Sequence, residues 1–115
     1  INLSNSNSNR KLTDLDFNSL PNLTLLDLNG NRFGGSIPST IGSLSKLSFL
    51  DLGNNSLEGT LPSEQGQLRE LQHVSFFNNI LNATIPCQLT TLPKVSYLDF
   101  GYNYFVSSLD WSLYI

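Results

Sequence analysis

Apolar residues recur along the chain with a period of 24 residues. A leucine opens each unit, and the residues that follow it keep the same register in every unit. Agreement over so many columns indicates a repeat array, in which each unit buries a thin apolar stripe against its neighbours. The columns are Leu20, Leu44, Leu68, Leu92; Leu23, Leu47, Leu71, Val95; Leu26, Leu50, Val74, Leu98; Leu28, Leu52, Phe76, Phe100; Phe33, Leu57, Leu81, Phe105; and Ile37, Leu61, Ile85, Leu109.

The alternation of apolar and polar positions predicts one short strand in each repeat. Leu26 and Leu28 flank Asp27, so alternate side chains point to opposite faces. Parallel stacking of such strands satisfies their backbone groups between neighbouring repeats. The block Ser39–Ser43, which follows Pro38, predicts a short helical turn.

An asparagine column follows the strands at the point where the chain must turn. A side-chain amide both donates and accepts hydrogen bonds, so it can satisfy turn backbone groups that no strand pairs. We therefore predict a structural ladder with one asparagine in each repeat. Its members are Asn31, Asn55, Asn79 and Asn103.

The segment LPNLTLLDLNGNRFGGSIPSTIGS resembles one unit of the plant-type leucine-rich repeat, LxxLxxLxLxxNxLxGxIPxxLGx. The resemblance implies a leucine-rich repeat solenoid of the α/β type, coiled right-handedly. It implies a parallel β-sheet on the concave face, a second sheet near the GxIP segment, and short helical or irregular convex segments. The four expected units are residues 20–43, 44–67, 68–91 and 92–115.

The start of the chain resembles a degenerate first repeat. In residues 1–19, Ile1 and Leu3 match the strand leucines, whereas Ser6 and Ser8 replace the expected Asn and Leu. The chain contains no methionine and opens inside an apparent strand. We therefore expect it to be a segment of a longer ectodomain.

Other positions also depart from the repeat pattern. Gln65 stands in a column that is otherwise apolar, and Ala83 replaces the column glycine. In the last unit, Ser107 replaces glycine and Asp110 stands where proline is expected, with Trp111 after it. We expect this last repeat to be irregular.

Charge and composition exclude several function classes. The formal net charge is −3 and the six basic residues are scattered, whereas a nucleic-acid or anionic-membrane surface needs clustered Lys and Arg. His73 and Cys87 are the only histidine and the only cysteine, so no metal cluster of ordinary ligand spacing can be assembled. The sequence has no phosphate-cradling glycine loop and no kinase motif. We predict a non-enzymatic scaffold without metal or cofactor, with any kinase domain lying outside these residues.

The solvent-facing strand positions predict a binding face. On a concave sheet these positions stack into columns about 4.8 Å apart. Exposed rings supply contact area and carboxylates fix a Lys, Arg or amino terminus, which suits an extended peptide. The predicted ligand-binding residues are Phe49, His73, Phe77, Tyr97, Tyr102, Asp51 and Asp99. The alternative is that the aromatics only favour strand structure and that the acidic residues only favour solubility.

Four triplets fit the N-x-S/T acceptor pattern for glycosylation. They begin at Asn2, Asn22, Asn54 and Asn82. In a chain so rich in Asn and Ser, some of these matches arise by chance. Asn82 is the preferred site because we expect it in a turn away from the concave strands. A glycan on Asn54 would lie beside the proposed binding face, so Asn54 is either unmodified or evidence against that face.

Among plant-type repeat proteins, the first residues look most like the start of a receptor-like kinase ectodomain. That resemblance implies a peptide or protein ligand, a co-receptor as a further partner, and signalling in development or defence. It also implies a parent protein anchored in the plasma membrane outside this chain, with these repeats on the extracellular side.

Two alternatives to the receptor remain open. One is a secreted inhibitor of a cell-wall hydrolase, similar to polygalacturonase inhibitors. The other is an ice-binding solenoid. Its surface would be a regular row of hydroxyls at a position where this repeat commonly carries Ser or Thr, namely Ser36, Thr60, Thr84 and Ser108.

Overall fold

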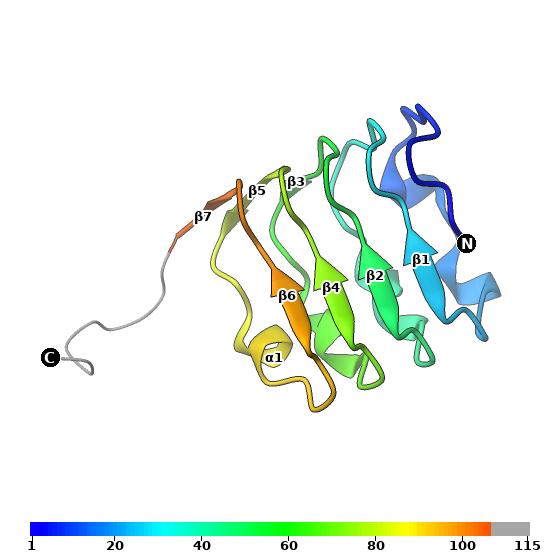
Figure 1. Cartoon of the computed structure of the whole chain (residues 1–115), viewed down its shortest axis with the longest axis vertical. Coiled ribbons are helices and arrows are strands. Elements are labelled where there is room, and N and C mark those ends of the chain that lie inside the picture. The colour runs from blue at the N-terminus through cyan, green and yellow to red at the C-terminus, as the bar shows by residue number, and fades with distance from the viewer. Residues whose placement is uncertain (107–115) are drawn as a thin grey trace, which may run out of the picture.

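The computed structural model describes residues 1–106 as a coil of stacked repeats (Figure 1). One strand from each full repeat joins a parallel sheet in the order β1-β2-β4-β6. Equivalent residues pair directly, as Leu26 does with Leu50 and Leu50 with Val74, which confirms the predicted 24-residue register. The strands are β1 (Leu25–Asp27), β2 (Phe49–Asp51), β4 (His73–Ser75) and β6 (Tyr97–Asp99).

A second parallel sheet lies beyond the turn that ends each strand of the first. Its strands are β3 (Glu58–Gly59), β5 (Ile80–Ala83) and β7 (Tyr104–Phe105), in the order β3-β5-β7. Glu58 pairs with Ile80, so partners here are two positions closer in sequence than the 24-residue period. The expected second sheet is present, in a register that the repeat columns alone do not predict.

Short helical segments complete each repeat on the side away from the first sheet (Figure 1). Three of them directly follow a proline, whose ring fixes φ and ends strand pairing. The helical turn predicted after Pro38 is thus confirmed. Within residues 1–106, no helix is long and apolar enough to span a bilayer. The segments are the 3₁₀ helices η1 (Leu12–Asp14), η2 (Phe17–Ser19), η3 (Ser39–Ser43) and η4 (Ser63–Gln67), and the α-helical turn α1 (Cys87–Thr90).

The apolar columns fill the interior of the coil, and the side chains of the inner repeats are fully buried. The phenyl ring of Phe76 stacks on that of Phe100 with centroids 5.8 Å apart. The first residues join the array as the repeat pattern predicts. The amide of Leu3 donates to the carbonyl of Asp27, and the amide of Asp27 donates to the carbonyl of Ile1.

The structure shows the consequences of two departures from the repeat pattern, at Gln65 and at Ala83. Gln65 is buried in its apolar column, and its side-chain oxygen and nitrogen have no hydrogen-bond partner among the described residues. Ala83 adopts a φ of 62°, close to the 73° of Gly35 and the 80° of Gly59 in the same column. The departures expected in the last repeat, with Ser107, Ser108, Leu109, Asp110 and Trp111, lie outside the described residues.

Candidate binding face

Three aromatic rings stack continuously across the first sheet. Strand pairing places Phe49, His73 and Tyr97 beside one another on β2, β4 and β6. The ring centroids of Phe49 and His73 are 4.3 Å apart, and those of His73 and Tyr97 are 4.4 Å apart, with planes within 10° of parallel. Phe49 and His73 are half-buried, whereas Tyr97 is 48% exposed. The fold therefore gathers three of the predicted ligand-binding residues into one surface, the aromatic stack.

The acidic row beside the stack has a structural task that the sequence did not reveal. Asp27, Asp51 and Asp99 each use one carboxylate oxygen to accept the backbone N–H two residues later, at 2.8–3.1 Å. Ser75 occupies the same row, and its hydroxyl oxygen accepts the amide of Phe77. Aspartate and serine commonly bond the backbone two residues ahead in this way. The row thus terminates each strand as it enters its turn.

The negative charge of the row is not neutralised by a basic side chain. Within residues 1–106 the only ion pair joins Lys94 to Glu70, away from the row. The second carboxylate oxygen of Asp99 accepts the Tyr97 hydroxyl at 3.3 Å. The charge of Asp99 raises the pKa of Tyr97 above its ordinary value of 10.0, with smaller contributions from desolvation, this hydrogen bond and the charge of Asp51. The carboxylates therefore remain available to a cationic group arriving from solvent.

Phe77 and Tyr102 form a separate aromatic pair at the end of the strands. Their rings meet edge to face, with centroids 5.1 Å apart and planes at 85°. A Cβ on Gly101 would come within 3.3 Å of the Phe77 ring, so the ring lies directly against this glycine. Tyr102 is 78% exposed and has a φ of 52°, the left-handed conformation that Gly30 adopts in the first full repeat. Asn54 and Asn78 adopt the same conformation in the intervening repeats, so it belongs to the turn of each repeat, and only the bulky side chain at Tyr102 is unusual there.

The asparagine column forms a hydrogen-bonded ladder inside the turns. The Nδ2 group of Asn79 donates to the carbonyls of Leu52 and Phe76, at 2.9 and 3.1 Å. Its Oδ1 atom accepts the amide of Leu57 at 3.0 Å. Asn31, Asn55 and Asn103 make equivalent bonds in their own repeats. These residues bind backbone groups of two adjacent repeats and are not free to bind a ligand.

The four candidate glycosylation sites differ in how their side chains are engaged. Asn54 is held in a surface chain of amides, since its Nδ2 donates to Asn29 and its Oδ1 accepts from Asn78. The Oδ1 atom of Asn22 accepts the Lys46 ammonium, and that of Asn2 accepts from Ser4. Asn82 is exposed and makes no side-chain hydrogen bond to a described residue. It lies in strand β5, so the expectation of a turn at this position was wrong, although β5 does lie away from the first sheet.

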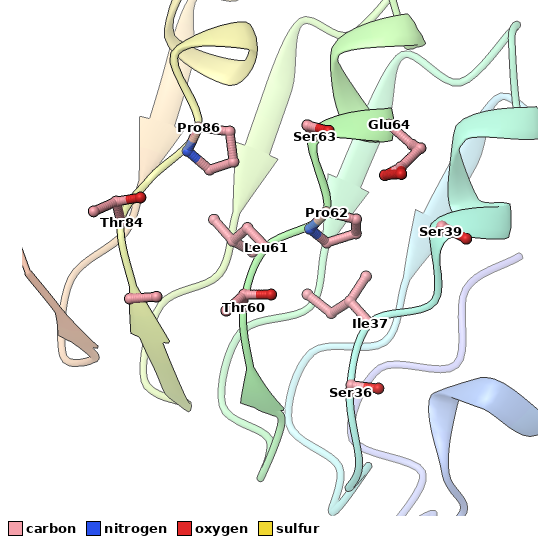
Figure 2. Close-up of a pocket in the computed structure, with 11 residues that line it drawn as sticks. Ser36, Ile37, Ser39, Thr60, Leu61, Pro62, Ser63, Glu64, Thr84 and Pro86 are labelled. Carbon is pink, nitrogen blue, oxygen red and sulfur yellow. The ribbon is translucent and has the colours of Figure 1, made fainter. Parts of the chain in front are cut away.

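An open groove of about 540 Å³ lies between the second sheet and the helical turns (Figure 2). Three of the hydroxyl residues singled out in the sequence line it in a row. Sequence reasoning missed the second polar row, from the positions directly after Pro38 and Pro62, although their fixed place in the repeat was a usable signal. The lining residues are Ser36, Ile37, Ser39, Thr60, Leu61, Pro62, Ser63, Glu64, Ala83, Thr84 and Pro86.

His73 and Cys87 lie in different parts of the fold. His73 belongs to the aromatic stack on β4, and Cys87 is an exposed free thiol at the start of α1. In the described part of the chain, no three His, Cys, Asp or Glu side chains are grouped so that they could hold a metal ion.

Comparisons with known proteins agree with this architecture. The Leucine Rich Repeat family model matches residues 22–44 and 46–68. No curated protein sequence matches the chain. The leucine-rich repeat ectodomain of the receptor kinase SOBIR1 from Arabidopsis thaliana is 37% identical, with a TM-score of 0.77, over 84% of this chain and 53% of that one.

Two further solved structures are similar. The Arabidopsis receptor kinase HAESA, in complex with the peptide hormone IDA and the co-receptor SERK1, is 34% identical, with a TM-score of 0.76. The similarity covers 84% of this chain and 16% of HAESA. A plant ice-binding protein is 31% identical, with a TM-score of 0.72, over 84% of this chain and 31% of its own.

The chain spans about half the length of the SOBIR1 ectodomain and a smaller part of the other two proteins. Within that span, the repeat period, the sheet register and the asparagine column all follow one pattern. Together with the similarities above, they show that the chain has the leucine-rich repeat solenoid fold, similar to the ectodomains of plant receptor kinases.

Proposed function

We propose that this chain is part of the extracellular domain of a plant receptor-like kinase and that its first sheet binds an extended peptide or protein segment. The carrying observation is the aromatic stack of Phe49, His73 and Tyr97 beside carboxylates that no basic side chain neutralises. Exposed, contiguous apolar surface usually marks a contact region, and aromatic residues dominate binding energies at interfaces. The similarity to HAESA, whose complex holds a peptide hormone and a co-receptor, supports the same kinds of partner here.

The face offers two kinds of contact to such a ligand. The stack gives area along the solenoid axis, and the Phe77–Tyr102 pair adds a second aromatic anchor. Asp51 and Asp99 lie on either side of Ser75 and supply two negative charges for a Lys, an Arg or an amino terminus. Because an open sheet provides no enclosed site in which to separate pKa values, we assign the chain no catalytic role.

A selection of peptides on the purified chain tests the predicted chemistry. Displayed random peptides enriched by the chain are expected to carry a basic residue. With the Asp51→Asn, Asp99→Asn double variant this preference is expected to disappear, while the capping hydrogen bonds can still form through the amide oxygens. Enrichment of the same basic peptides by the double variant would contradict the assigned role of the carboxylates.

The receptor assignment has its own test in the parent transcript. Beyond Ile115 we expect further 24-residue repeats, then an apolar span of about 20 residues and kinase motifs. A stop codon shortly after Ile115 would overturn the assignment. A secreted inhibitor of a cell-wall hydrolase would then become the leading hypothesis. Its test is whether the chain binds a pectinase and loses that binding when Asp51 and Asp99 are changed.

A second candidate function is adsorption to ice. The similarity to a plant ice-binding protein and the exposed row Ser36, Thr60 and Thr84 favour it. It ranks second because these hydroxyls line a hollow, whereas a crystal plane requires a flat complementary face. Inhibition of ice recrystallisation that is lost on changing Thr60 and Thr84 to tyrosine would promote it above the receptor role.

A further inference from the structure

The groove between the second sheet and the helical turns is chemically unlike the first sheet. Five hydroxyls line it in two rows, and none of them hydrogen-bonds another residue in the part of the chain that the structure describes. Between the rows lie the apolar side chains of Ile37 and Leu61 and the ring of Pro62 (Figure 2). Ile37 and Leu61 are almost fully buried, so the half-buried rings of Pro62 and Pro86 supply the apolar surface of the groove. Free hydroxyls beside such rings suit a ligand that is itself both hydroxylated and apolar on its ring faces. The hydroxyl residues are Ser36, Thr60, Thr84, Ser39 and Ser63.

The charge of the groove narrows the ligand class further. Among residues 1–106, Glu64 is the only charged residue in the lining, and no Lys or Arg of that part of the chain borders the hollow. An anionic ligand would meet one carboxylate and no cation, whereas a neutral ligand loses nothing by this arrangement. The Glu64 carboxylate can instead accept hydrogen bonds from ligand hydroxyls. A neutral carbohydrate fits this lining.

A candidate attachment site for carbohydrate, Asn82, lies near the edge of the groove. Thr84, which lines the hollow, is also the hydroxyl residue of the acceptor triplet that begins at Asn82. Ala83 between them is left-handed, with a φ of 62°, so the chain bends there. The two residues therefore lie no farther apart than two residues of extended chain, about 7 Å, which is roughly the length of one sugar ring. Asn82 is exposed and its amide is not engaged by a described side chain, unlike that of Asn54. A sugar linked to Asn82 would therefore begin beside the Thr84 end of the groove.

We propose that Asn82 carries an N-linked glycan whose inner, neutral sugar units lie along this groove. In the modification, Nδ2 of Asn82 forms a bond to the anomeric carbon of a lipid-linked oligosaccharide. The anomeric carbon–oxygen bond breaks, the lipid pyrophosphate leaves with its electron pair, and Nδ2 gives up one proton to solvent. Sugar hydroxyls then pair with the hydroxyls of Thr60 and Ser63 and with Glu64. This site uses none of the first-sheet residues, so it is independent of ligand binding there.

The test compares glycosylated forms of the full chain made in a secretory plant host. Mass spectrometry of peptides is expected to find Asn82 modified. Hydrogen exchange at the amides of Thr60, Leu61, Ser63 and Glu64 is expected to be several-fold slower in the wild type than in Asn82→Gln. The Asn22→Gln variant, which lacks a different acceptor, is the matched control and should keep the slow exchange. A Thr60→Tyr variant, which fills the middle of the groove, should remain glycosylated and lose the protection.

Four results would overturn the proposal. An unmodified Asn82 would remove the source of the sugar. Equal exchange at residues 60–64 in the wild type and in Asn82→Gln would show a glycan that stays in solvent. Protection that survives Thr60→Tyr, or that a free neutral oligosaccharide restores in Asn82→Gln to the wild-type level, would show that the linked glycan is not the occupant.

Discussion

The imidazole ring of His73 lies parallel to the phenol ring of Tyr97, with the two planes 5° apart and the centroids 4.4 Å apart. The relationship follows from parallel in-register pairing, which sets equivalent side chains of adjacent strands side by side. Because Phe49 lies on the other face of the imidazole, the stack spans three repeats. A surface that continues from one strand to the next can follow an extended ligand along the solenoid.

The hydroxyl of Tyr97 is predicted to report the charge of the acidic row. Asp99 is the largest cause of its raised pKa, so Asp99→Asn should lower that pKa toward 10.0, and Asp51→Asn should lower it less. An NMR titration of the Tyr97 ring carbon bonded to oxygen measures both shifts. An unchanged pKa in Asp99→Asn would contradict the assignment.

The same raised pKa fixes the sign of a stability effect. The folded chain holds the Tyr97 proton to higher pH than the unfolded chain does. The contribution of the protonated Tyr97 to the unfolding free energy is therefore fully present below the unfolded pKa near 10.0. It is lost as pH rises through the higher pKa of the folded chain. In Asp99→Asn, the decline in unfolding free energy above pH 10 should be shallower than in the wild type.

Asn79 is predicted to be essential for stability. In Asn79→Ala the amide of Leu57 loses its only partner within residues 1–106 in a buried turn, whereas the carbonyls of Leu52 and Phe76 each lose one bond and keep the one from Asn55 or Asn103. Leaving the buried Leu57 amide unsatisfied costs about 1–3 kcal/mol and each lost carbonyl bond about 0.5–1.5 kcal/mol, so we expect a loss of about 3 kcal/mol. Urea denaturation measures it. Asn82→Ala in unglycosylated protein is the control and should change stability by less than about 0.5 kcal/mol.

Gln65→Leu is predicted to stabilise the chain. The Gln65 amide is buried without a partner, between repeats whose equivalent residues are Ile41 and Leu89. Restoring the apolar column removes a desolvation cost of about 1–3 kcal/mol. Gln67→Leu changes an exposed glutamine in the same helix and should have little effect. A destabilised Gln65→Leu would show that the amide is satisfied, for instance by internal water.

Ala83→Gly is predicted to raise the unfolding free energy by about 0.5–1 kcal/mol. Alanine at a φ of 62° bears a left-handed penalty of about 1–2 kcal/mol, of which the extra freedom of glycine in the unfolded chain offsets part. Gly59→Ala makes the reverse change at the equivalent position and should destabilise the chain. Its new Cβ would meet Ser36 only at an ordinary 3.6 Å, so backbone conformation and not crowding sets the effect. Equal stability of both variants and the wild type would refute the strain.

The sequence predicted the parts of the fold that repeat. The period of 24 sufficed for the register of the first sheet, the asparagine column and the helical turn after Pro38, because each repeat packs on a near-copy of itself. The columns also placed Phe49, His73 and Tyr97 on one surface. What the columns could not give was the role of a single atom, such as the Asp51 oxygen that accepts the Gly53 amide.

Features that break the 24-residue period could not be predicted from the sequence either. The offset pairing of Glu58 with Ile80 depends on the path of the turn between the two sheets, which is not encoded in column identity. Asn82 was expected in a turn, yet the chain continues there as strand β5, with Ala83 left-handed. The groove forms where the hydroxyl row beside the second sheet faces the row that follows the prolines, across three repeats. The repeat columns do not show that these two rows face each other.

The affinity of a selected peptide for paired tyrosine variants tests the binding face most directly. Tyr97 lies in the aromatic stack, whereas Tyr104 is 68% exposed on the second sheet and serves as the matched control. Calorimetric titration should show at least tenfold weaker binding to Tyr97→Ala, a loss of about 1.4 kcal/mol or more, and unchanged binding to Tyr104→Ala. Undiminished affinity in Tyr97→Ala, or a loss confined to Tyr104→Ala, would contradict recognition on the first sheet.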